Sequence, residues 1–453
     1  MRTTTHRILV PDRSAQQTTV PDRQVSVLQR SINPPERSLQ ITRHPVQPIM
    51  RQTHTTLSEP QPFMLPMPPV LPKVATVLSL SAVARQAEKL GTGVEDLVLL
   101  LPAHNEELII AETIRSAIAA GQPKKDIYVV NDNSSDDTEA IAIRLLGKDN
   151  VLTVERSGKA LAVKKAINAF QIESRYTWLH IADADSIFSQ NYFRHYRKKL
   201  DPKKYAVAVG FVQSLRGNWI STYRALTYTY SQQVTRRVQS HLGMISVFPG
   251  PITCFRTDII KDLEFGGASL TEDFDITLQV HRKKLGNILF IPKAVNYTQD
   301  PQTIADFCKQ NLRWQRGFFQ GVKKYRIGFR GQRIDVSLGF QMFQTLFFLL
   351  QLLVLLPMVL VMTGNWMVIP VIIAIDIIFN AAIALFSSVA AKRWALIGAL
   401  PYFYFLRWLE IGIYLMAFVE VIVLQRFQDE IVGWSTADRR YKLSSQALLD
   451  VAK

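Results

Sequence analysis

The chain has 453 residues, 48% of them hydrophobic, and carries a formal net charge of +16 at pH 7. This length is more than one ordinary hydrophobic core needs, and the long apolar runs in the last third of the sequence exclude a wholly water-soluble protein. The two cysteines, Cys254 and Cys308, have neither a metal-binding spacing nor a disulfide framework. We therefore expect a soluble domain joined to a lipid-embedded region, with both cysteines reduced and serving only in packing.

The excess of positive charge suits an anionic membrane surface, a phosphate-bearing substrate or a nucleic acid. Lys and Arg gather in residues 309–333, directly before the first apolar run, where basic residues commonly hold the cytoplasmic end of a membrane helix. The sequence has no recognised nucleic-acid-binding motif. Membrane lipid is therefore the expected partner, and no nucleic acid is expected.

Residues 1–72 are rich in Arg, Gln, Thr, Ser and Pro, and they repeat Val-Pro-Asp-Arg at 10–13 and 20–23. They show no sustained apolar period and no apolar core of signal-peptide length. This composition predicts a disordered basic arm that is solvated rather than bound to anionic lipid.

From residue 94 onwards, short apolar runs alternate with stretches of helical periodicity. The predicted strands cover residues 96–101, 126–130, 150–154 and 177–181, and the helices between them end near residues 120, 146 and 170. Such alternation predicts an α/β domain with a mostly parallel sheet, which binds ligands at the carboxyl ends of its strands.

Polar clusters follow three of these strands, at residues 103–106, 131–133 and 183–185. In open sheets of this type such clusters converge on the crevice where a nucleotide normally sits. The last cluster holds Asp183 and Asp185, whose carboxylates leave the strand together at a loop. Mg²⁺ and Mn²⁺ prefer oxygen ligands and complete their shells with water and diphosphate oxygens, so these two acids suit a divalent metal.

Two further motifs lie on predicted helices. Residues 270–275 place several carboxylates at a helix start, which a cap formed by Thr271 and the helix dipole would explain without any chemistry. Residues 310–317 present an amide, a guanidinium and an indole on one helical face through Gln310, Arg313 and Trp314. Such a face can bind diphosphate and stack on a sugar ring, whereas a basic amphipathic helix lying on the membrane is the alternative.

Residues 340–362 and 367–389 are each long enough, at ~1.5 Å per residue, to cross a hydrocarbon layer of ~30 Å. Lys392 and Arg393 follow the second run, and the positive-inside rule places them in the cytoplasm together with the soluble domain. We therefore expect a multi-pass protein of the plasma membrane. Residues 396–424 predict either one long helix or an interfacial segment followed by a crossing, with charges that face a polar channel or pair between helices.

The order of Asp132, Asp183-x-Asp185, Thr271-Glu272-Asp273 and Gln310-x-x-Arg313-Trp314, followed by apolar helices, resembles the processive family 2 glycosyltransferases over residues 95–430. This family includes the cellulose, chitin, hyaluronan and poly-N-acetylglucosamine synthases. The resemblance implies a GT-A fold over residues 94–300, amphipathic interface helices over 301–335 and a transmembrane region over 339–430. It also implies a UDP-sugar donor, Mg²⁺ or Mn²⁺ as cofactor, and inversion at the anomeric carbon.

The resemblance further implies a role for each matching residue. The nucleotide-sugar-binding residues are Pro102, Asn105, Glu106, Asp132, Lys159, Asp183 and Arg313. The acceptor-binding residues are Glu272, Gln310 and Trp314, the metal ligands are Asp183 and Asp185, and the catalytic base is Asp273. His104 stands where many relatives carry Tyr, and the N-terminal membrane helices of the family are missing, which leaves room for a membrane partner subunit.

The expected function is transfer of a sugar from a UDP-sugar to a growing polysaccharide at the membrane, an arrangement that allows coupling to export. One alternative keeps the donor chemistry but uses a lipid acceptor of the ceramide or polyprenyl-phosphate type. Another alternative is a non-catalytic nucleotide-binding scaffold in the membrane, against which the complete set of acidic motifs argues.

Overall fold

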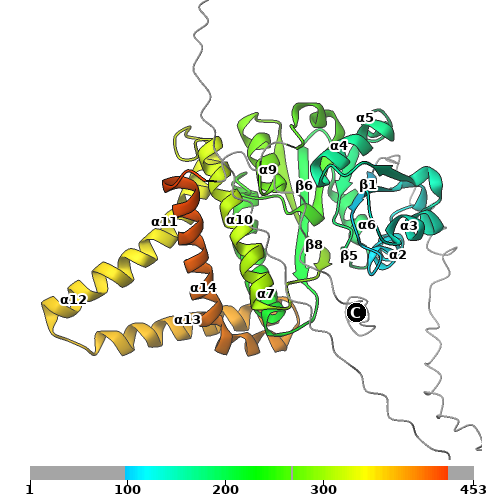
Figure 1. Ribbon diagram of the computed structural model, residues 1–453. Coiled ribbons are helices and arrows are strands. Elements are labelled where there is room, and N and C mark those ends of the chain that lie inside the picture. The colour runs from blue at the N-terminus through cyan, green and yellow to red at the C-terminus, as the bar shows by residue number, and fades with distance from the viewer. Residues whose placement is uncertain (1–96, 267–268, 427–453) are drawn as a thin grey trace, which may run out of the picture. The chain divides into compact units, whose positions relative to one another are not determined.

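The computed structural model describes residues 97–266 and 269–426, so the arm expected over residues 1–72 lies outside the described residues (Figure 1). At the centre of the described part, an eight-stranded sheet has the strand order β3-β2-β1-β4-β7-β6-β8-β5. Helices cover both faces of this sheet, and a group of longer helices follows it in the chain.

The first half of the sheet is parallel, as the alternation of strands and helices predicts. β1 (Leu97–Ala103) pairs with both β2 (Ile127–Asp132) and β4 (Trp178–Ile181), and β3 (Val151–Val154) pairs with β2. The crossovers between these strands carry α2 (Ile110–Ala119), α3 (Thr138–Leu146) and α4 (Lys159–Ala169). The carboxyl ends of these strands therefore share one edge of the sheet.

The second half departs from the predicted, mostly parallel arrangement, so the sheet as a whole is mixed. β7 (Thr253–Arg256) runs antiparallel to both β4 and β6 (Tyr205–Ser214). β8 (Asn287–Thr298) is parallel to β6, while the short β5 (Ile187–Phe188) is antiparallel to β8. The cause is local, because β7 begins beside the carboxyl end of β4 and must run back across the sheet from there.

Burial of apolar side chains on both faces holds the strands in place. Every residue of β1 is buried, and successive side chains enter opposite cores: Val98 and Leu100 enter one, Leu99 and Leu101 the other. Burying one such leucine side chain contributes about 1.5–3 kcal/mol. This two-sided core fixes the strand ends, and with them the polar clusters that follow.

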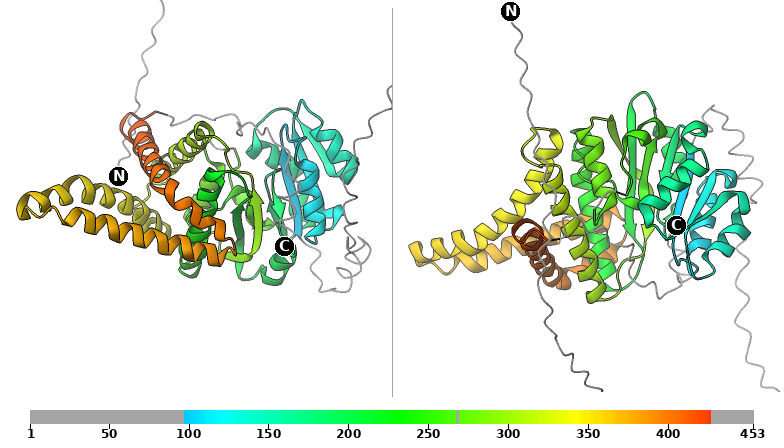
Figure 2. Two further views of the ribbon diagram at one scale, coloured as in Figure 1. Left: turned by 90° about the horizontal axis from the view of Figure 1, so that it is seen from below. Right: turned by 45° about the horizontal axis from the view of Figure 1, so that its top comes forward.

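Two helices of the C-terminal region are long and apolar enough to cross a membrane, and they match the two predicted runs. The first spans Arg333–Thr363 and consists of α11 (Arg333–Leu350), a π-helical turn and α12 (Leu356–Thr363). The second is α13 (Val368–Ala390). Figures 1 and 2 show them as a hairpin that extends away from the sheet, so most of their apolar side chains have no protein neighbour to cover them.

Residues 396–424 contain a single long helix, α14 (Leu400–Phe418), which continues into a π-helical turn. It packs along α10 (Ile304–Lys324) and also contacts α7 (Trp219–Tyr230). Its charged side chains pair as follows: Arg407 with Asp376 at 3.7 Å, Glu410 with the Tyr223 hydroxyl at 2.8 Å, and Glu420 with Arg316 at 2.7 Å. From the sequence, these charged side chains are expected either to face a polar channel or to pair between helices, and the contacts agree with pairing between helices.

Another ion pair joins the start of α11 to α9 (Glu272–Arg282). The Arg282 guanidinium donates to both carboxylate oxygens of Asp335, at 2.6 and 2.9 Å, and each side chain is only 5% exposed. The first apolar helix is therefore joined directly to the helix that carries Asp273.

Candidate active site

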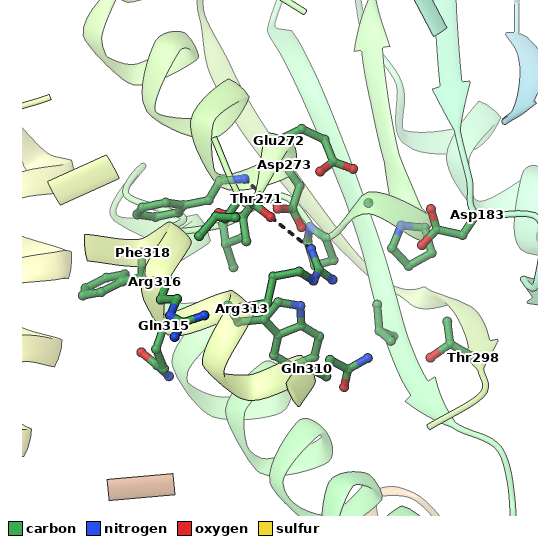
Figure 3. Close-up of a pocket in the computed structure, with 18 of the residues that line it drawn as sticks. Asp183, Thr271, Glu272, Asp273, Thr298, Gln310, Arg313, Gln315, Arg316 and Phe318 are labelled. Atoms are coloured by element: carbon green, nitrogen blue, oxygen red, sulfur yellow. Dashed lines mark hydrogen bonds between the residues drawn. The ribbon is translucent and has the colours of Figure 1, made fainter. Parts of the chain in front are cut away.

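A cavity of about 1150 Å³ opens at the carboxyl edge of the parallel strands. Segments far apart in the sequence meet around it: the loop after β4, the start of α9 and the middle of α10 (Figure 3). The predicted site residues that line it are Glu106, Lys159, Asp183, Asp185, Glu272, Asp273, Gln310, Arg313 and Trp314. One cavity thus brings together most of the residues that the motifs singled out, while their individual roles stay predictions.

Lys159 joins two of the predicted motifs. It is the first residue of α4, and its Nζ lies 2.6 Å from Asp183 Oδ1 and 3.3 Å from Glu272 Oε1. Burial disfavours the ammonium charge, but attraction to Asp183 and Glu272 outweighs burial, so the pKa of Lys159 is raised. Lys159 therefore stays protonated and keeps a positive charge in the cavity wall.

Asp273 lies in the first turn of α9, where its Oδ1 accepts a hydrogen bond from the Phe274 amide at 2.8 Å. Burial, and then repulsion from Glu272, raise the pKa of Asp273 to about 6. Attraction to Lys159 and Arg313 acts in the opposite direction but is weaker. A carboxylate with a pKa near neutrality can accept and release a proton, which is the property of a general base.

The close approach of α9 to α10 depends on two glycines. Thr271 stands at the N-cap of α9, yet its hydroxyl makes no capping hydrogen bond, so the capping explanation of this motif is wrong. Instead Thr271 packs on Gly317 of α10, where a Cβ atom would collide with it, and a Cβ atom at Gly321 would lie 2.5 Å from Phe274. Glycines four residues apart on one helical face are the sequence signal for such an approach, and a search for catalytic motifs alone misses it.

α10 forms one wall of the cavity. Arg313 Nη1 donates to the Leu270 carbonyl at 3.1 Å, and Figure 3 shows its guanidinium pointing toward Asp273. Gln310 and Trp314 contact Arg224 of α7, a buried residue that no sequence motif singled out. Because α10 packs against α9, α7 and α14, it is not a helix that simply lies on the membrane, which was the alternative.

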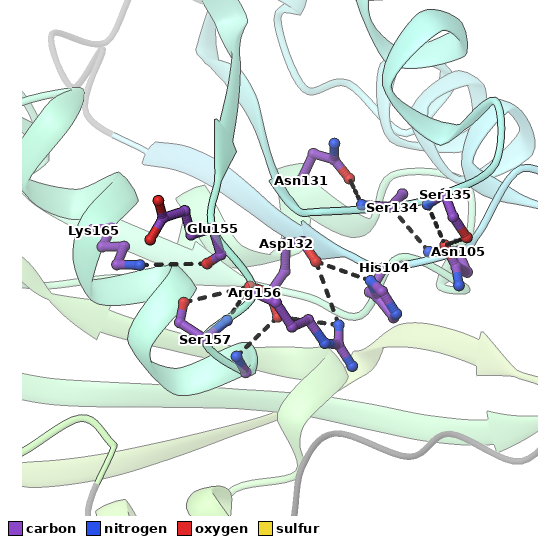
Figure 4. Close-up of polar contacts among 11 residues, drawn as sticks. His104, Asn105, Asn131, Asp132, Ser134, Ser135, Glu155, Arg156, Ser157 and Lys165 are labelled. Carbon is purple, nitrogen blue, oxygen red and sulfur yellow. Dashed lines mark hydrogen bonds and ion pairs between the residues drawn. The ribbon is translucent and has the colours of Figure 1, made fainter.

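Asp132 ends β2, and its contacts with the loop at residues 156–158 are drawn in Figure 4. It is not among the residues that line the cavity, so its predicted contact with a nucleotide stays a prediction. Its side chain is completely buried, and its two carboxylate oxygens accept hydrogen bonds from the Ser157 and Gly158 amides at 2.8 and 2.9 Å. Arg156 adds an ion pair at 3.2 Å. Asp132 therefore positions the loop before Lys159.

Pro102 and Asn105 are likewise outside the cavity wall. Pro102 is buried within β1, and Asn105 adopts a left-handed backbone (φ 56°) while its Oδ1 accepts a hydrogen bond from the loop after β2 at 2.9 Å. Between them, His104 Nδ1 lies 2.9 Å from the Asp132 carbonyl oxygen (Figure 4). These contacts order the loops around the strand ends, and only Glu106 of this predicted group reaches the cavity, where it is 2% exposed.

Asp183 and Asp185 are the groups that suit a divalent metal. Both line the cavity; Asp185 is 6% exposed, and Asp183 is held by Lys159. No group of three or more His, Cys, Asp or Glu side chains that could hold a metal occurs among the described residues. Two carboxylates are enough for Mg²⁺ or Mn²⁺ where diphosphate and water oxygens complete the shell, so this donor set fits a metal that binds together with a nucleotide.

Among solved structures, the chain is similar to a mannosyltransferase from Pyrobaculum calidifontis in complex with GDP-Man and Mn²⁺. That similarity has a TM-score of 0.44 and 16% identity, and it covers 71% of this chain and 93% of that chain. Glucosyl-3-phosphoglycerate synthase from Mycobacterium tuberculosis, in complex with Mn²⁺, uridine diphosphate and phosphoglyceric acid, is similar with a TM-score of 0.36 and 17% identity, over 55% of this chain and 82% of that chain.

Residues 95–317 match the family described as glycosyltransferase like family 2. Poly-β-1,6-N-acetyl-D-glucosamine synthase from Staphylococcus aureus is 26% identical over 229 residues, which are 49% of this chain and 54% of that protein. The synthase of the same name from Staphylococcus epidermidis is 26% identical over 230 residues, 49% of this chain and 55% of that protein. The chain thus spans about half the length of the curated relatives it matches. Residues 95–317 thus match a glycosyltransferase family 2 domain and contain a mixed α/β sheet, and over this part the chain is similar to the poly-β-1,6-N-acetyl-D-glucosamine synthases.

Proposed function

We propose that the enzyme transfers a sugar from a UDP-sugar to the end of a growing polysaccharide at the membrane, with inversion at the anomeric carbon. The observation that carries this proposal is the single cavity that Asp183, Asp185, Asp273 and Trp314 all line. Donor and acceptor groups must share one space for direct transfer, because the attacking oxygen and the anomeric carbon must come within ~3–3.5 Å of each other.

The donor is held mainly by its diphosphate. Lys159 and Arg313 supply positive charge at the cavity wall, and an arginine can form bidentate hydrogen bonds with phosphate oxygens. Asp183 and Asp185 would hold Mg²⁺ or Mn²⁺, whose charge would stabilise the departing diphosphate. The loop that Asp132 positions adds backbone groups to the same wall.

Sugar transfer is a single displacement. The acceptor hydroxyl oxygen attacks the anomeric carbon, the bond from that carbon to the diphosphate oxygen breaks, and Asp273 takes the hydroxyl proton. The Phe274 amide holds Oδ1 of this carboxylate, which leaves Oδ2 for the proton. With a pKa of about 6, Asp273 is ionised at neutral pH and basic enough to assist, a contribution typically worth ~10²–10⁴ in rate.

The hairpin of apolar helices would span the plasma membrane, with the catalytic domain on the cytoplasmic side. Exposed side chains support this placement, since Phe340 is 58% and Ile378 69% exposed. The cavity also extends from Trp314 to Gln341 and Thr345 of α11, which gives a chain of several sugars a polar path toward the bilayer. Coupling to export and a membrane partner subunit belong to the same proposal.

A lipid-linked acceptor of the ceramide or polyprenyl-phosphate type is the second candidate, and one observation favours it. Leu338 and Met342 of α11 line the cavity beside the polar residues of the same helix, so this end of the cavity can also contact an acyl or prenyl chain. A non-catalytic scaffold is not proposed, because Asp183, Asp185 and Asp273 all line one cavity and residues 95–317 match a glycosyltransferase family.

The test uses the detergent-solubilised protein, a panel of UDP-sugars, and Mg²⁺ or Mn²⁺, with UDP release as the readout. Gel filtration of radiolabelled product separates a polymer from a single-sugar lipid, which extracts into organic solvent. Asp273→Asn is expected to lose at least ~10²-fold in turnover while it still binds UDP. Asp258→Asn, at an exposed acid outside the cavity, is the matched control. An unchanged rate of UDP release by Asp273→Asn would remove the assignment of the base.

A further inference from the structure

Arg224 lies behind the acceptor side of the cavity and is almost completely buried, with 2% of it exposed. It belongs to α7 and does not line the cavity itself. Its Nη1 donates to the Tyr228 hydroxyl and its Nη2 donates to Gln310 Oε1, both at 3.0 Å. A buried cation is therefore joined directly to two side chains that do line the cavity.

Aromatic rings surround the guanidinium group. Its central carbon lies 4.7 Å from the ring centroids of both Phe307 and Trp314. Along α10, Gln310 follows Phe307 by three residues and Trp314 follows it by seven. The three side chains therefore share the helical face that is turned toward Arg224. Cation–π contacts of this kind offset part of the cost of burying the charge, and they fix the guanidinium in place.

The chemistry of arginine determines how its two neighbours are oriented. A guanidinium has only donors, so the Gln310 atom that faces it must be Oε1, which leaves the two hydrogens of Nε2 for another partner. For the same reason the Tyr228 oxygen must accept from Arg224, which directs its own proton elsewhere. Burial raises the pKa of Tyr228, so the hydroxyl keeps that proton. Within the described part of the chain, neither Gln310 Nε2 nor the Tyr228 proton has a protein acceptor.

We infer that Arg224 is a positioning residue that turns this wall of the cavity into a pair of hydrogen-bond donors, Gln310 Nε2 and the Tyr228 hydroxyl, for the sugar at the acceptor end. The wall then selects an acceptor that offers lone-pair oxygens there, in hydroxyl, ring or carbonyl form. A protonated amino group cannot accept a hydrogen bond from either of these two donors. This inference rests on the proposed function and adds the polarity of its acceptor site.

The inference is tested with Arg224→Met and Arg224→Lys, using as acceptor a short oligosaccharide isolated from the wild-type product. Arg224→Met should raise the acceptor KM about tenfold or more, the loss expected when a charge-assisted hydrogen bond disappears. The KM for the UDP-sugar, measured from hydrolysis without acceptor, should change much less. Arg224→Lys keeps the charge but loses the planar guanidinium group that donates to both Tyr228 and Gln310. Its acceptor KM should therefore lie between those of the wild type and Arg224→Met.

A double mutant shows whether Arg224 acts through Gln310. Gln310→Leu removes the amide that Arg224 orients, so adding Arg224→Met to it should raise the acceptor KM by less than the single Arg224→Met change does in the wild type. Arg282→Met serves as the control for loss of another buried arginine, since Arg282 does not line the cavity. If Arg282→Met partly unfolds the protein, donor hydrolysis and transfer to the acceptor should fall together, unlike the selective effect on the acceptor expected for Arg224→Met.

An unchanged acceptor KM in Arg224→Met would overturn the inference. So would an equal rise in both KM values, or fully multiplicative effects of Arg224→Met and Gln310→Leu. If the wild-type enzyme releases no UDP from any UDP-sugar, or makes no polymer, the proposed function fails and takes the inference with it. A wild type that makes polymer, together with an Arg224→Met variant indistinguishable from it, refutes the inference alone.

Discussion

Asp273→Asn should stabilise the folded protein while it abolishes sugar transfer. The substitution keeps the size of the side chain and the oxygen that accepts from the Phe274 amide, but it removes a carboxylate that is costly to ionise where it stands. Burial and the neighbouring Glu272 create this cost, and both remain in the variant. The proposed catalytic base is therefore also a source of instability in the absence of substrate.

The magnitude follows from the pKa of Asp273, which folding raises from an ordinary 3.8 to about 6. Each pKa unit corresponds to about 1.4 kcal/mol, so ionisation of Asp273 lowers the free energy of unfolding by about 3 kcal/mol at pH 8. Because the pKa of this carboxyl is raised, the protonated form is favoured in the folded state. The full stability is therefore present below pH 3.8 and is lost as the pH rises through 6. At pH 5 the loss is about half of its final value, so Asp273→Asn should stabilise about twice as much at pH 8 as at pH 5.

The assay is thermal unfolding of wild type and variant in the same detergent at pH 5 and pH 8, without nucleotide or metal. Asp258→Asn, which changes an acid that is 60% exposed, is the control and should show no such dependence on pH. A variant no more stable than the wild type at pH 8, or equally stabilised at both pH values, would refute the reasoning. It would mean that the partly buried position of Asp273 beside Glu272 does not raise its pKa.

Four further outcomes are expected. Asp185→Ala should lose at least ~10²-fold in UDP release and its response to added Mg²⁺ or Mn²⁺, and full activity in chelator would contradict this. Trp314→Ala should reduce transfer to acceptor more than donor hydrolysis, as separate assays of the two reactions would show. Gly317→Ala should cost about 1–3 kcal/mol in unfolding free energy, because the added methyl group forces α9 away from α10. Arg282→Met should cost about 3–5 kcal/mol, because it leaves the Asp335 carboxylate buried without its partner; a melting temperature equal to that of the wild type would contradict this.

Much of the site could be predicted from the sequence because the relevant pattern is local. A buried strand that ends at Ile181, just before Asp183 and Asp185, must present both acids at the sheet edge. A helix that begins at Glu272 must present its first-turn carboxylates at its amino end. The parallel strands then bring these ends together, whatever the loops between them do. The helix with Gln310 completes the cavity for the same reason, since helical spacing fixes which side chains share a face.

What could not be predicted depends on contacts between distant segments. Asp132 stands at a strand end like Asp183, and only the return of the loop at residues 156–158 decides that its carboxylate binds backbone amides instead of facing the cavity. Arg224 and Gln310 are far apart in the sequence, and nothing in the composition of α7 marks one arginine as buried. The direction of β7 likewise follows from where the chain enters the sheet, which hydrophobic periodicity does not encode.

The contacts of α11 and α14 also determine where this protein can be cut. The family boundary at Gly317 falls inside α10, so a soluble fragment that ends there would lack the last third of that helix. Such a fragment would also leave Arg282 buried without Asp335, and Tyr223 without Glu410. The limits of the family match therefore do not mark an autonomous folding unit. Purification, crystallisation or inhibitor screening should start from a chain that retains both C-terminal helices.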